Sequence, residues 1–167
     1  KGDNMGAGIN VSCKCKSKSY MLGVGMMFPD EYKKMVDMIK AGKFGEEGKN
    51  IMRTVKYAVV DIEKSLYFCE KCGNITQAKP MDYYAPKNVD KVAKEEYGIK
   101  TVEEWGEVPY WAPYMDFDNN YSLIKKTQHK CSICKHEMIR VDEEKLRNMK
   151  CPKCGEKYEV FQDMLWD

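Results

Sequence analysis

The strongest constraint on this 167-residue chain is that all eight of its cysteines occur in close pairs. Three pairs have the form Cys-x-x-Cys and one has the form Cys-x-Cys. The pairs are Cys13/Cys15, Cys69/Cys72, Cys131/Cys134 and Cys151/Cys154. Two residues between the cysteines allow a tight turn to direct both sulfurs at one ion, and a following glycine gives the turn a positive φ. The pattern predicts two metal centres, each held by four thiolates.

The cellular compartment bears on whether such cysteines bind metal or form disulfides. Residues 1–12 contain a single lysine and no apolar run, which does not fit a secretory signal. The sequence also has no stretch of 18 apolar residues, so we expect no association with a membrane. These features predict a cytoplasmic protein, and in a reducing cytoplasm paired cysteines bind metal more often than they form disulfides.

Composition narrows the class of protein. Hydrophobic residues make up 43% of the chain and charged residues 32%, which excludes collagen-like, disordered and membrane proteins. The 28 basic and 26 acidic residues give a formal charge of +2. Because a zinc ion with four thiolates carries about −2, two such centres would make the loaded chain slightly acidic. No strong overall attraction to nucleic acid follows.

The two C-terminal pairs, Cys131/Cys134 and Cys151/Cys154, are separated by sixteen residues, a spacing typical of zinc sites. Between them we expect a strand over 137–141, an acidic turn over 142–144 and a second strand leading into Cys151. Residues 127–162 therefore resemble the zinc-ribbon family. The resemblance implies a tetrahedral structural metal bound by these four cysteines.

The remaining four cysteines form the second expected centre. Cys69 and Cys72, followed by Gly73, form a complete knuckle, and their expected partners are Cys13 and Cys15. The sequence leaves open whether Cys13 and Cys15 bind the same ion. His129 or His136 is an alternative ligand, although a surface position is favoured for both histidines because four cysteines already fill a tetrahedron.

Zinc, at two structural ions per chain, is the expected metal, and iron is the alternative. The Cys-Pro-x-Cys-Gly sequence at Cys151 is similar to a rubredoxin knuckle, and all-sulfur tetrahedral sites hold either metal. A rubredoxin needs two knuckles with the trailing glycine, whereas each such knuckle is here paired with one that lacks it. A four-thiolate centre has no open position for water, so no catalytic residue is predicted and an enzyme is not expected.

The expected fold is α+β, with small antiparallel hairpins around the two metal centres and a few short helices. A helix should begin near Asp30 with Tyr32, Met35, Val36 and Ile39 on its buried face, and a second helix should cover 46–55. The Gly-rich residues 1–12 are expected to be flexible. Three parts are expected: an N-terminal module over 1–85, an irregular connection over 86–120 and a C-terminal zinc ribbon over 121–167.

The expected function is that of a binding module for nucleic acid or a nucleic-acid machine. The alternatives are a protein–protein adaptor and an iron electron carrier, and no small-molecule substrate is indicated. The chain also resembles short uncharacterised bacterial proteins with tandem cysteine knuckles, which implies no activity. The candidate nucleic-acid-binding residues are basic side chains of the C-terminal part: Lys125, Lys126, Lys130, Lys135, Arg140, Arg147, Lys150 and Lys153.

Overall fold

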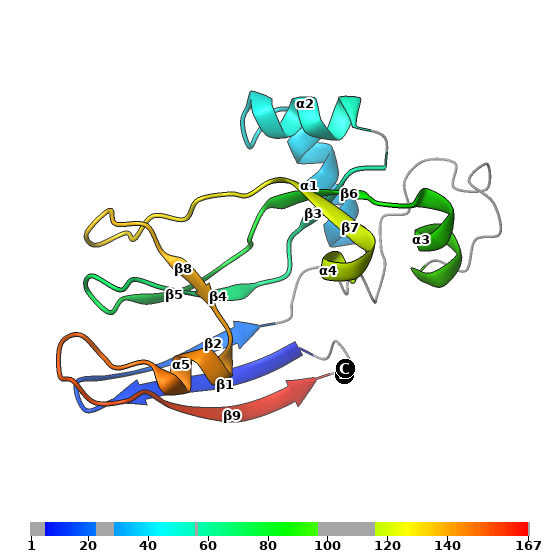
Figure 1. The fold of residues 1–167 in the computed structure, drawn as a ribbon. Helices are drawn as coiled ribbons and strands as arrows, with labels where there is room; N and C mark the ends of the chain where they lie inside the picture. The colour runs from blue at the N-terminus through cyan, green and yellow to red at the C-terminus, as the bar shows by residue number, and fades with distance from the viewer. Residues whose placement is uncertain (1–5, 23–28, 56, 97–115, 167) are drawn as a thin grey trace. The chain divides into compact units, whose positions relative to one another are not determined.

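The computed structural model describes residues 6–22, 29–55, 57–96 and 116–166. In this part of the chain the fold is α+β, as predicted, with three antiparallel three-stranded sheets and five short helices (Figure 1). None of these helices has the length and apolar character needed to span a membrane. The elements in chain order are β1 (Gly6–Cys13), β2 (Lys16–Leu22), α1 (Pro29–Lys40), α2 (Glu46–Thr54), β3 (Val59–Asp61), β4 (Ser65–Phe68), β5 (Ile75–Ala78), β6 (Asp82–Pro86), α3 (Val89–Glu96), α4 (Phe117–Asn120), β7 (Tyr121–Lys125), β8 (Ile139–Val141), α5 (Glu143–Asn148) and β9 (Glu159–Trp166).

The chain forms two compact units, each assembled from segments far apart in the sequence. The first, which we call the knuckle unit, comprises Lys1–Val24, Glu63–Pro80 and Gln128–Asp167. The second, the helical unit, comprises Gly25–Ile62 and Met81–Thr127. This division differs from the expected succession of 1–85, 86–120 and 121–167, because the strands of the knuckle unit pair across the whole length of the chain.

The knuckle unit contains two sheets with the same plan. In one, β1 pairs antiparallel with both β2 and β9; in the other, β4 pairs antiparallel with both β5 and β8. Each sheet thus joins a hairpin to a third strand from the C-terminal part of the chain. The arrangement is nested, since the third strand of the second sheet precedes the third strand of the first. Residues 6–12 lie in β1, so the expectation that they are flexible was wrong; residues 1–5 lie outside the described part of the chain.

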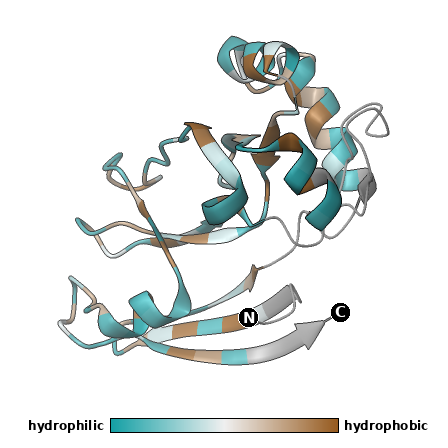
Figure 2. Cartoon of the chain, turned by 45° about the vertical axis from the view of Figure 1, so that its right-hand side comes forward, coloured by the Kyte–Doolittle hydropathy of each residue, from teal (hydrophilic) through white to brown (hydrophobic). Residues whose placement is uncertain are grey.

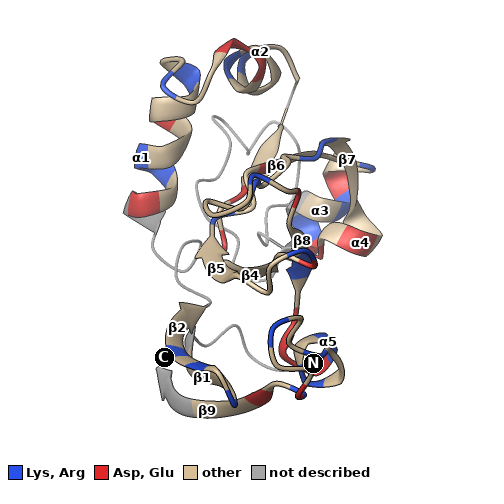
Figure 3. Cartoon of the chain, turned by 90° about the vertical axis from the view of Figure 1, so that its left-hand side faces the viewer, with Lys and Arg blue, Asp and Glu red and all other residues tan. Residues whose placement is uncertain are grey.

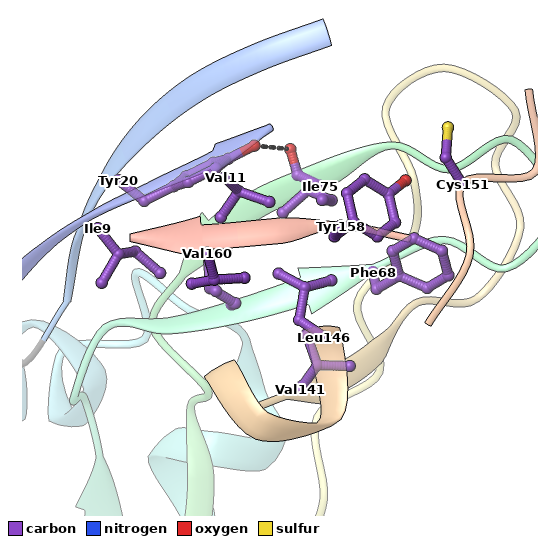
Figure 4. Close-up of a cluster of buried hydrophobic side chains, with 11 residues drawn as sticks. Ile9, Val11, Tyr20, Phe68, Ile75, Val141, Leu146, Cys151, Tyr158 and Val160 are labelled. Carbon is purple, nitrogen blue, oxygen red and sulfur yellow. Dashed lines mark hydrogen bonds between the residues drawn. The ribbon is translucent and has the colours of Figure 1, made fainter. Parts of the chain in front are cut away.

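Alternating side chains of these strands form the core of the knuckle unit (Figure 4). On β1, Ile9 and Val11 are buried, and they are paired with Tyr20 and Val160 on the neighbouring strands. The Tyr20 hydroxyl donates a hydrogen bond of 3.0 Å to the carbonyl oxygen of Ile75. Each fully buried side chain of this size contributes about 1.5–3 kcal/mol relative to an exposed one. Among the described residues, this cluster contains eleven buried side chains and a second cluster of the unit contains four, so the core is small and metal ligation could contribute to folding.

The helical unit has a core of its own. The predicted buried face of α1 is confirmed, because Tyr32, Met35, Val36 and Ile39 are all buried. They pack with Met52 of α2 and with residues of the β3-β6-β7 sheet. Figure 2 shows apolar and hydrophilic bands alternating along the helices of this unit, as expected of amphipathic helices.

Candidate metal centres

The structure gathers all eight cysteines into two groups of four within the knuckle unit. In each group every sulfur lies within 4.8 Å of the other three. Centre 1 consists of Cys13, Cys15, Cys151 and Cys154; centre 2 consists of Cys69, Cys72, Cys131 and Cys134. The prediction of two four-cysteine groups that could hold metal ions is therefore confirmed.

The predicted assignment of cysteine pairs to centres was wrong. Cys131/Cys134 does not meet Cys151/Cys154, and Cys13/Cys15 does not meet Cys69/Cys72. The physical reason is the nested strand pairing. The knuckle that precedes β8 is carried to the β4–β5 hairpin, whereas the knuckle that precedes β9 is carried to the β1–β2 hairpin. Between the two C-terminal knuckles lies the helix α5, in place of the expected second strand.

The distances between sulfurs fit four ligands around one ion. In centre 1 the Cys13 and Cys15 sulfurs are 3.5 Å apart, and Cys15 lies 3.6 Å from Cys151. In centre 2 the Cys134 sulfur lies 3.4 Å from Cys69 and 3.7 Å from Cys72, and the sulfurs of Cys72 and Cys131 are 3.6 Å apart. A tetrahedron with metal–sulfur bonds of about 2.3 Å has edges of about 3.8 Å, whereas a disulfide bond measures about 2.05 Å. All eight cysteines are free, and the donor set fits a tetrahedral metal ion.

The three Cys-x-x-Cys turns share one backbone geometry. The N–H of the first cysteine donates to the carbonyl five residues later, and its own carbonyl accepts from the residue four positions on. Both hydrogen bonds measure 2.8–2.9 Å in all three turns. The residue after the second cysteine has a positive φ: 67° at Gly73, 60° at Lys135 and 75° at Gly155. The knuckle without a glycine thus folds in the same way, with a lysine in the left-handed conformation.

Because Lys135 occupies that conformation, Lys135→Gly should stabilise the protein. A residue with a Cβ in the left-handed conformation destabilises the fold by about 1–2 kcal/mol, and glycine removes this strain. Glycine also has a larger conformational entropy in the unfolded chain, which cancels part of the stabilisation. We expect the free energy of unfolding of the metal-loaded protein to rise by about 1 kcal/mol, measured by chemical denaturation. Ser132→Gly, in the same knuckle but not at positive φ, is the control and should lower stability. A Lys135→Gly protein no more stable than wild type would contradict this account.

The Cys-x-Cys pair is explained by its place at a hairpin end. Cys13 closes β1 and pairs with Lys16 at the start of β2, so Lys14 and Cys15 form a two-residue turn. This turn brings both sulfurs to the same group without a glycine. The sequence left open whether Cys13 and Cys15 belong to the same site, and the structure places both in one four-sulfur group.

Hydrogen bonds to the sulfurs make one thiol of each centre acidic. The backbone N–H groups of Cys134 and Ile133 point at Cys131 and lower its pKa to about 6. Burial opposes ionisation of Cys151, but the Tyr158 hydroxyl and the N–H groups of Cys154 and Lys153 outweigh it, and the pKa of Cys151 falls to about 6.

The opposite shift affects one other thiol in each centre. Burial raises the pKa of Cys72 to about 12, and a hydrogen bond with the Cys13 thiol raises that of Cys15 to about 12. Four thiolates at these separations repel one another, so all four ionise together only when a cation compensates their charge. The chemistry of each group is therefore that of a cation site that releases protons on binding.

Two residues that the sequence reasoning missed contact the ligands. The Asn74 side-chain amide lies 3.6 Å from the Cys131 sulfur, and Tyr158 is buried in the same core cluster as Cys151. Contacts of this kind orient metal ligands. Their positions carry a weak signal, since each follows a knuckle by only a few residues: Asn74 comes two residues after Cys72, and Tyr158 four after Cys154.

Neither histidine belongs to a four-sulfur group. The His129 ring lies against Tyr67, with ring centroids 4.1 Å apart, and its Nε2 is 3.0 Å from the carbonyl oxygen of Pro80. His136 is exposed, and its carbonyl oxygen accepts the N–H of Cys131. The structure thus gives His129 a packing role and gives His136 a place in the backbone of a knuckle.

The eight candidate nucleic-acid-binding residues are divided between the two units, and Figure 3 shows Lys and Arg on elements of both. Lys125 and Lys126 belong to the helical unit, where Lys125 forms a 2.5 Å ion pair with Glu47. Arg147 on α5 is paired with Glu143 at 3.2 Å, and Arg140 lies on β8. The other four lie in the knuckle unit within four residues of a cysteine ligand, namely Lys130, Lys135, Lys150 and Lys153.

Comparison with known proteins does not extend this description. No protein-family model, no curated protein and no solved structure matches the chain.

Proposed function

We propose that this protein is a zinc-binding module in which two structural zinc ions hold the knuckle unit and lysines of the knuckles contact nucleic acid. The observation that carries the proposal is the convergence of eight cysteines into two groups with tetrahedral spacing. Each group combines a hairpin end with a knuckle that leads into a third strand, an arrangement that resembles a zinc ribbon. Bound zinc would supply a rigid link between the ends of these strands.

The donor chemistry supports zinc in a structural role. Four thiolates complete a tetrahedron, so no position is left for water or a substrate. Tyr67 and Met138 pack in one cluster with the cysteines of centre 2, of which Cys69 and Cys131 are fully buried. Metal analysis of protein purified from its native host should give two zinc ions per chain and a colourless solution. A coloured protein that contains iron would contradict this proposal and support the electron-carrier alternative.

The lysines of the knuckles support the nucleic-acid part of the proposal. In the described part of the chain, the following lysines lie within or beside a knuckle and form no ion pair: Lys14, Lys71, Lys130, Lys135, Lys150, Lys153 and Lys157.

One pair of these lysines is placed to attract an anion. Lys150 and Lys157 are directly opposite each other across a β-bridge, whereas the equivalent pair at the other C-terminal knuckle is Lys130 and Glu137. Like charges in this position repel each other unless an anion lies between them. A phosphate group would relieve the repulsion, which supports a backbone contact at this point.

The corresponding prediction concerns the double variant Lys150→Glu/Lys157→Glu. We expect it to weaken binding of zinc-loaded protein to labelled single-stranded RNA or DNA by about tenfold or more at low salt. The slope of log K against log salt should also become shallower, by about one unit for each lost phosphate contact. Fluorescence anisotropy over a series of salt concentrations measures both quantities.

The matched control reverses two exposed lysines of the helical unit, in Lys34→Glu/Lys43→Glu. It changes the net charge equally and should leave binding nearly unchanged. Equal losses in the two double variants would show a non-specific charge effect and contradict the assignment to the knuckles. Wild-type binding that ignores salt, or no binding, would favour the protein–protein adaptor as the function.

A further inference from the structure

The two candidate metal centres are in direct contact through their knuckles. The knuckle 69–73 carries two ligands of centre 2, and the knuckle 151–155 carries two ligands of centre 1. A Cβ placed on Gly73 would lie 2.7 Å from Cδ and 2.8 Å from Cγ of Pro152, closer than side chains pack. Gly73 therefore allows the backbone of one knuckle to touch the proline ring of the other. Pro152 is covalently joined to Cys151, so a shift of this ring moves a ligand of centre 1.

Tyr158 connects the same two knuckles. Its side chain is buried in the same cluster as Cys151, and its hydroxyl donates a hydrogen bond of 3.4 Å to the carbonyl oxygen of Gly73. The ring contacts Phe68 edge-on, at a centroid distance of 5.9 Å, and Phe68 directly precedes Cys69 (Figure 4). One side chain, four residues after the centre 1 ligand Cys154, thus contacts both ends of the knuckle that carries Cys69 and Cys72 of centre 2.

A third connection comes from Lys16, next to Cys15 of centre 1. Its ammonium group donates to the carbonyl oxygen of Gly73 and lies 5.3 Å from the centroid of the Tyr158 ring. Gly73 therefore accepts hydrogen bonds from two residues beside centre 1 while belonging to a knuckle of centre 2. Ordering either centre therefore fixes groups that contact a knuckle of the other.

We infer that the two centres bind zinc with positive cooperativity, transmitted through Gly73, Tyr158 and Lys16; this inference rests on the proposed function. Binding of the first ion includes the entropic cost of ordering the contacts that the two knuckles share. The second ion binds to knuckles that are already ordered, so its binding does not include this cost. Couplings of this kind change affinity by 5- to 150-fold, and we expect about tenfold here. Gly73, Tyr158 and Lys16 are positioning residues, since none of them supplies a ligand sulfur.

Native mass spectrometry of the reduced full-length chain tests the coupling, with zinc supplied from a chelator-buffered solution. At half-saturation, two independent sites leave at least half of the chains with a single ion, whatever their affinities. Tenfold coupling between equal sites lowers this fraction to about a quarter. A wild-type fraction at or above one half would overturn the inference. A wild-type chain that binds no zinc would instead overturn the proposed function, and the inference with it.

Gly73→Ala and Gly155→Ala form a matched pair of variants. Both place a Cβ at a positive φ, 67° and 75° respectively, but nothing lies within 4 Å of a Cβ at Gly155. Gly155→Ala should keep the low single-ion fraction, and Gly73→Ala should raise it to half or more. If the single-ion fraction is the same in both variants and below one half, the contact at Gly73 does not transmit the coupling, and the inference is overturned.

A second pair keeps the test decisive if Gly73→Ala does not fold. Tyr158→Phe removes the hydroxyl between the knuckles, whereas Tyr20→Phe removes a buried hydroxyl bonded to Ile75, away from the cysteine ligands. Tyr158→Phe should raise the single-ion fraction, and Tyr20→Phe should leave it at the wild-type value. If both retain the wild-type fraction, the hydroxyl does not transmit the coupling and the inference fails.

Discussion

Replacing Cys131 and Cys151 together by serine should abolish both metal centres, although the double variant keeps six of the eight cysteines. The structure places these two residues in different four-sulfur groups. Three thiolates and a serine hydroxyl form a much weaker zinc site, so each substitution removes one ion. We expect zinc analysis to fall from two ions per chain to none.

The companion variant Cys15→Ser/Cys151→Ser carries the same number of substitutions within one group. It should retain one zinc ion, because centre 2 keeps all its ligands. A C-terminal zinc ribbon would give the reverse result, with one ion left in Cys131→Ser/Cys151→Ser and none in Cys15→Ser/Cys151→Ser. Ile133→Ser, an exposed change in the same knuckle as Cys131, should retain both ions. The comparison tests the pairing independently of the identity of the metal.

The pairing could not be predicted from spacing because spacing is a local property. Sixteen residues between two knuckles are compatible with a shared ion, but they do not determine which knuckles meet. That choice is made by the β-ladders, in which β1 pairs with β9 and β4 with β8 over large sequence separations. The identity of the ligands, by contrast, depends only on short Cys-x-x-Cys and Cys-x-Cys turns. For this reason the sequence was sufficient to predict that all eight cysteines belong to four-cysteine groups.

A local signal against the ribbon was present between the two C-terminal knuckles. Asp142, followed by two glutamates, is a typical helix N-terminus. In the structure the Asp142 carboxylate accepts the N–H of Lys145 at 2.6 Å and begins α5, which buries Leu146 completely. A helix in this position cannot be the second strand of a ribbon hairpin. Similarly, Ile9 and Val11 alternate with small residues, a pattern that indicated the strand β1 despite its glycines.

The prediction was most accurate where an element could be derived from its own residues. The helix α1 has apolar residues at helical spacing, and these are the residues that it buries. The three Cys-x-x-Cys turns also share one geometry, including the turn in which Lys135 replaces glycine. Under the proposed function, the strain of about 1–2 kcal/mol in that turn is small compared with the free energy of binding a structural zinc ion. Metal ligation would then tolerate a residue that turn propensity alone would reject.

Removing the metal should unfold the knuckle unit and leave the helical unit folded. Binding of a structural zinc ion contributes about 10–16 kcal/mol, which exceeds or matches the whole stability of a typical domain at about 5–15 kcal/mol. The knuckle unit contains all eight cysteines and a small core, so without metal nothing links the ends of its strands at the two centres. The helical unit contains no cysteine and packs α1 and α2 on its own sheet.

Hydrogen–deuterium exchange of the full chain, with and without a zinc chelator under reducing conditions, measures this difference. Amides of β1, β4 and β9 should lose their protection on chelation, whereas those of α1 and α2 should keep it. Adding zinc back to the stripped protein should restore protection of the three strands. Calcium in place of zinc is the control and should restore nothing, because thiolates bind calcium poorly. Strands that remain protected without metal would show that the apolar core alone holds the knuckle unit, and that the ions are dispensable for its fold.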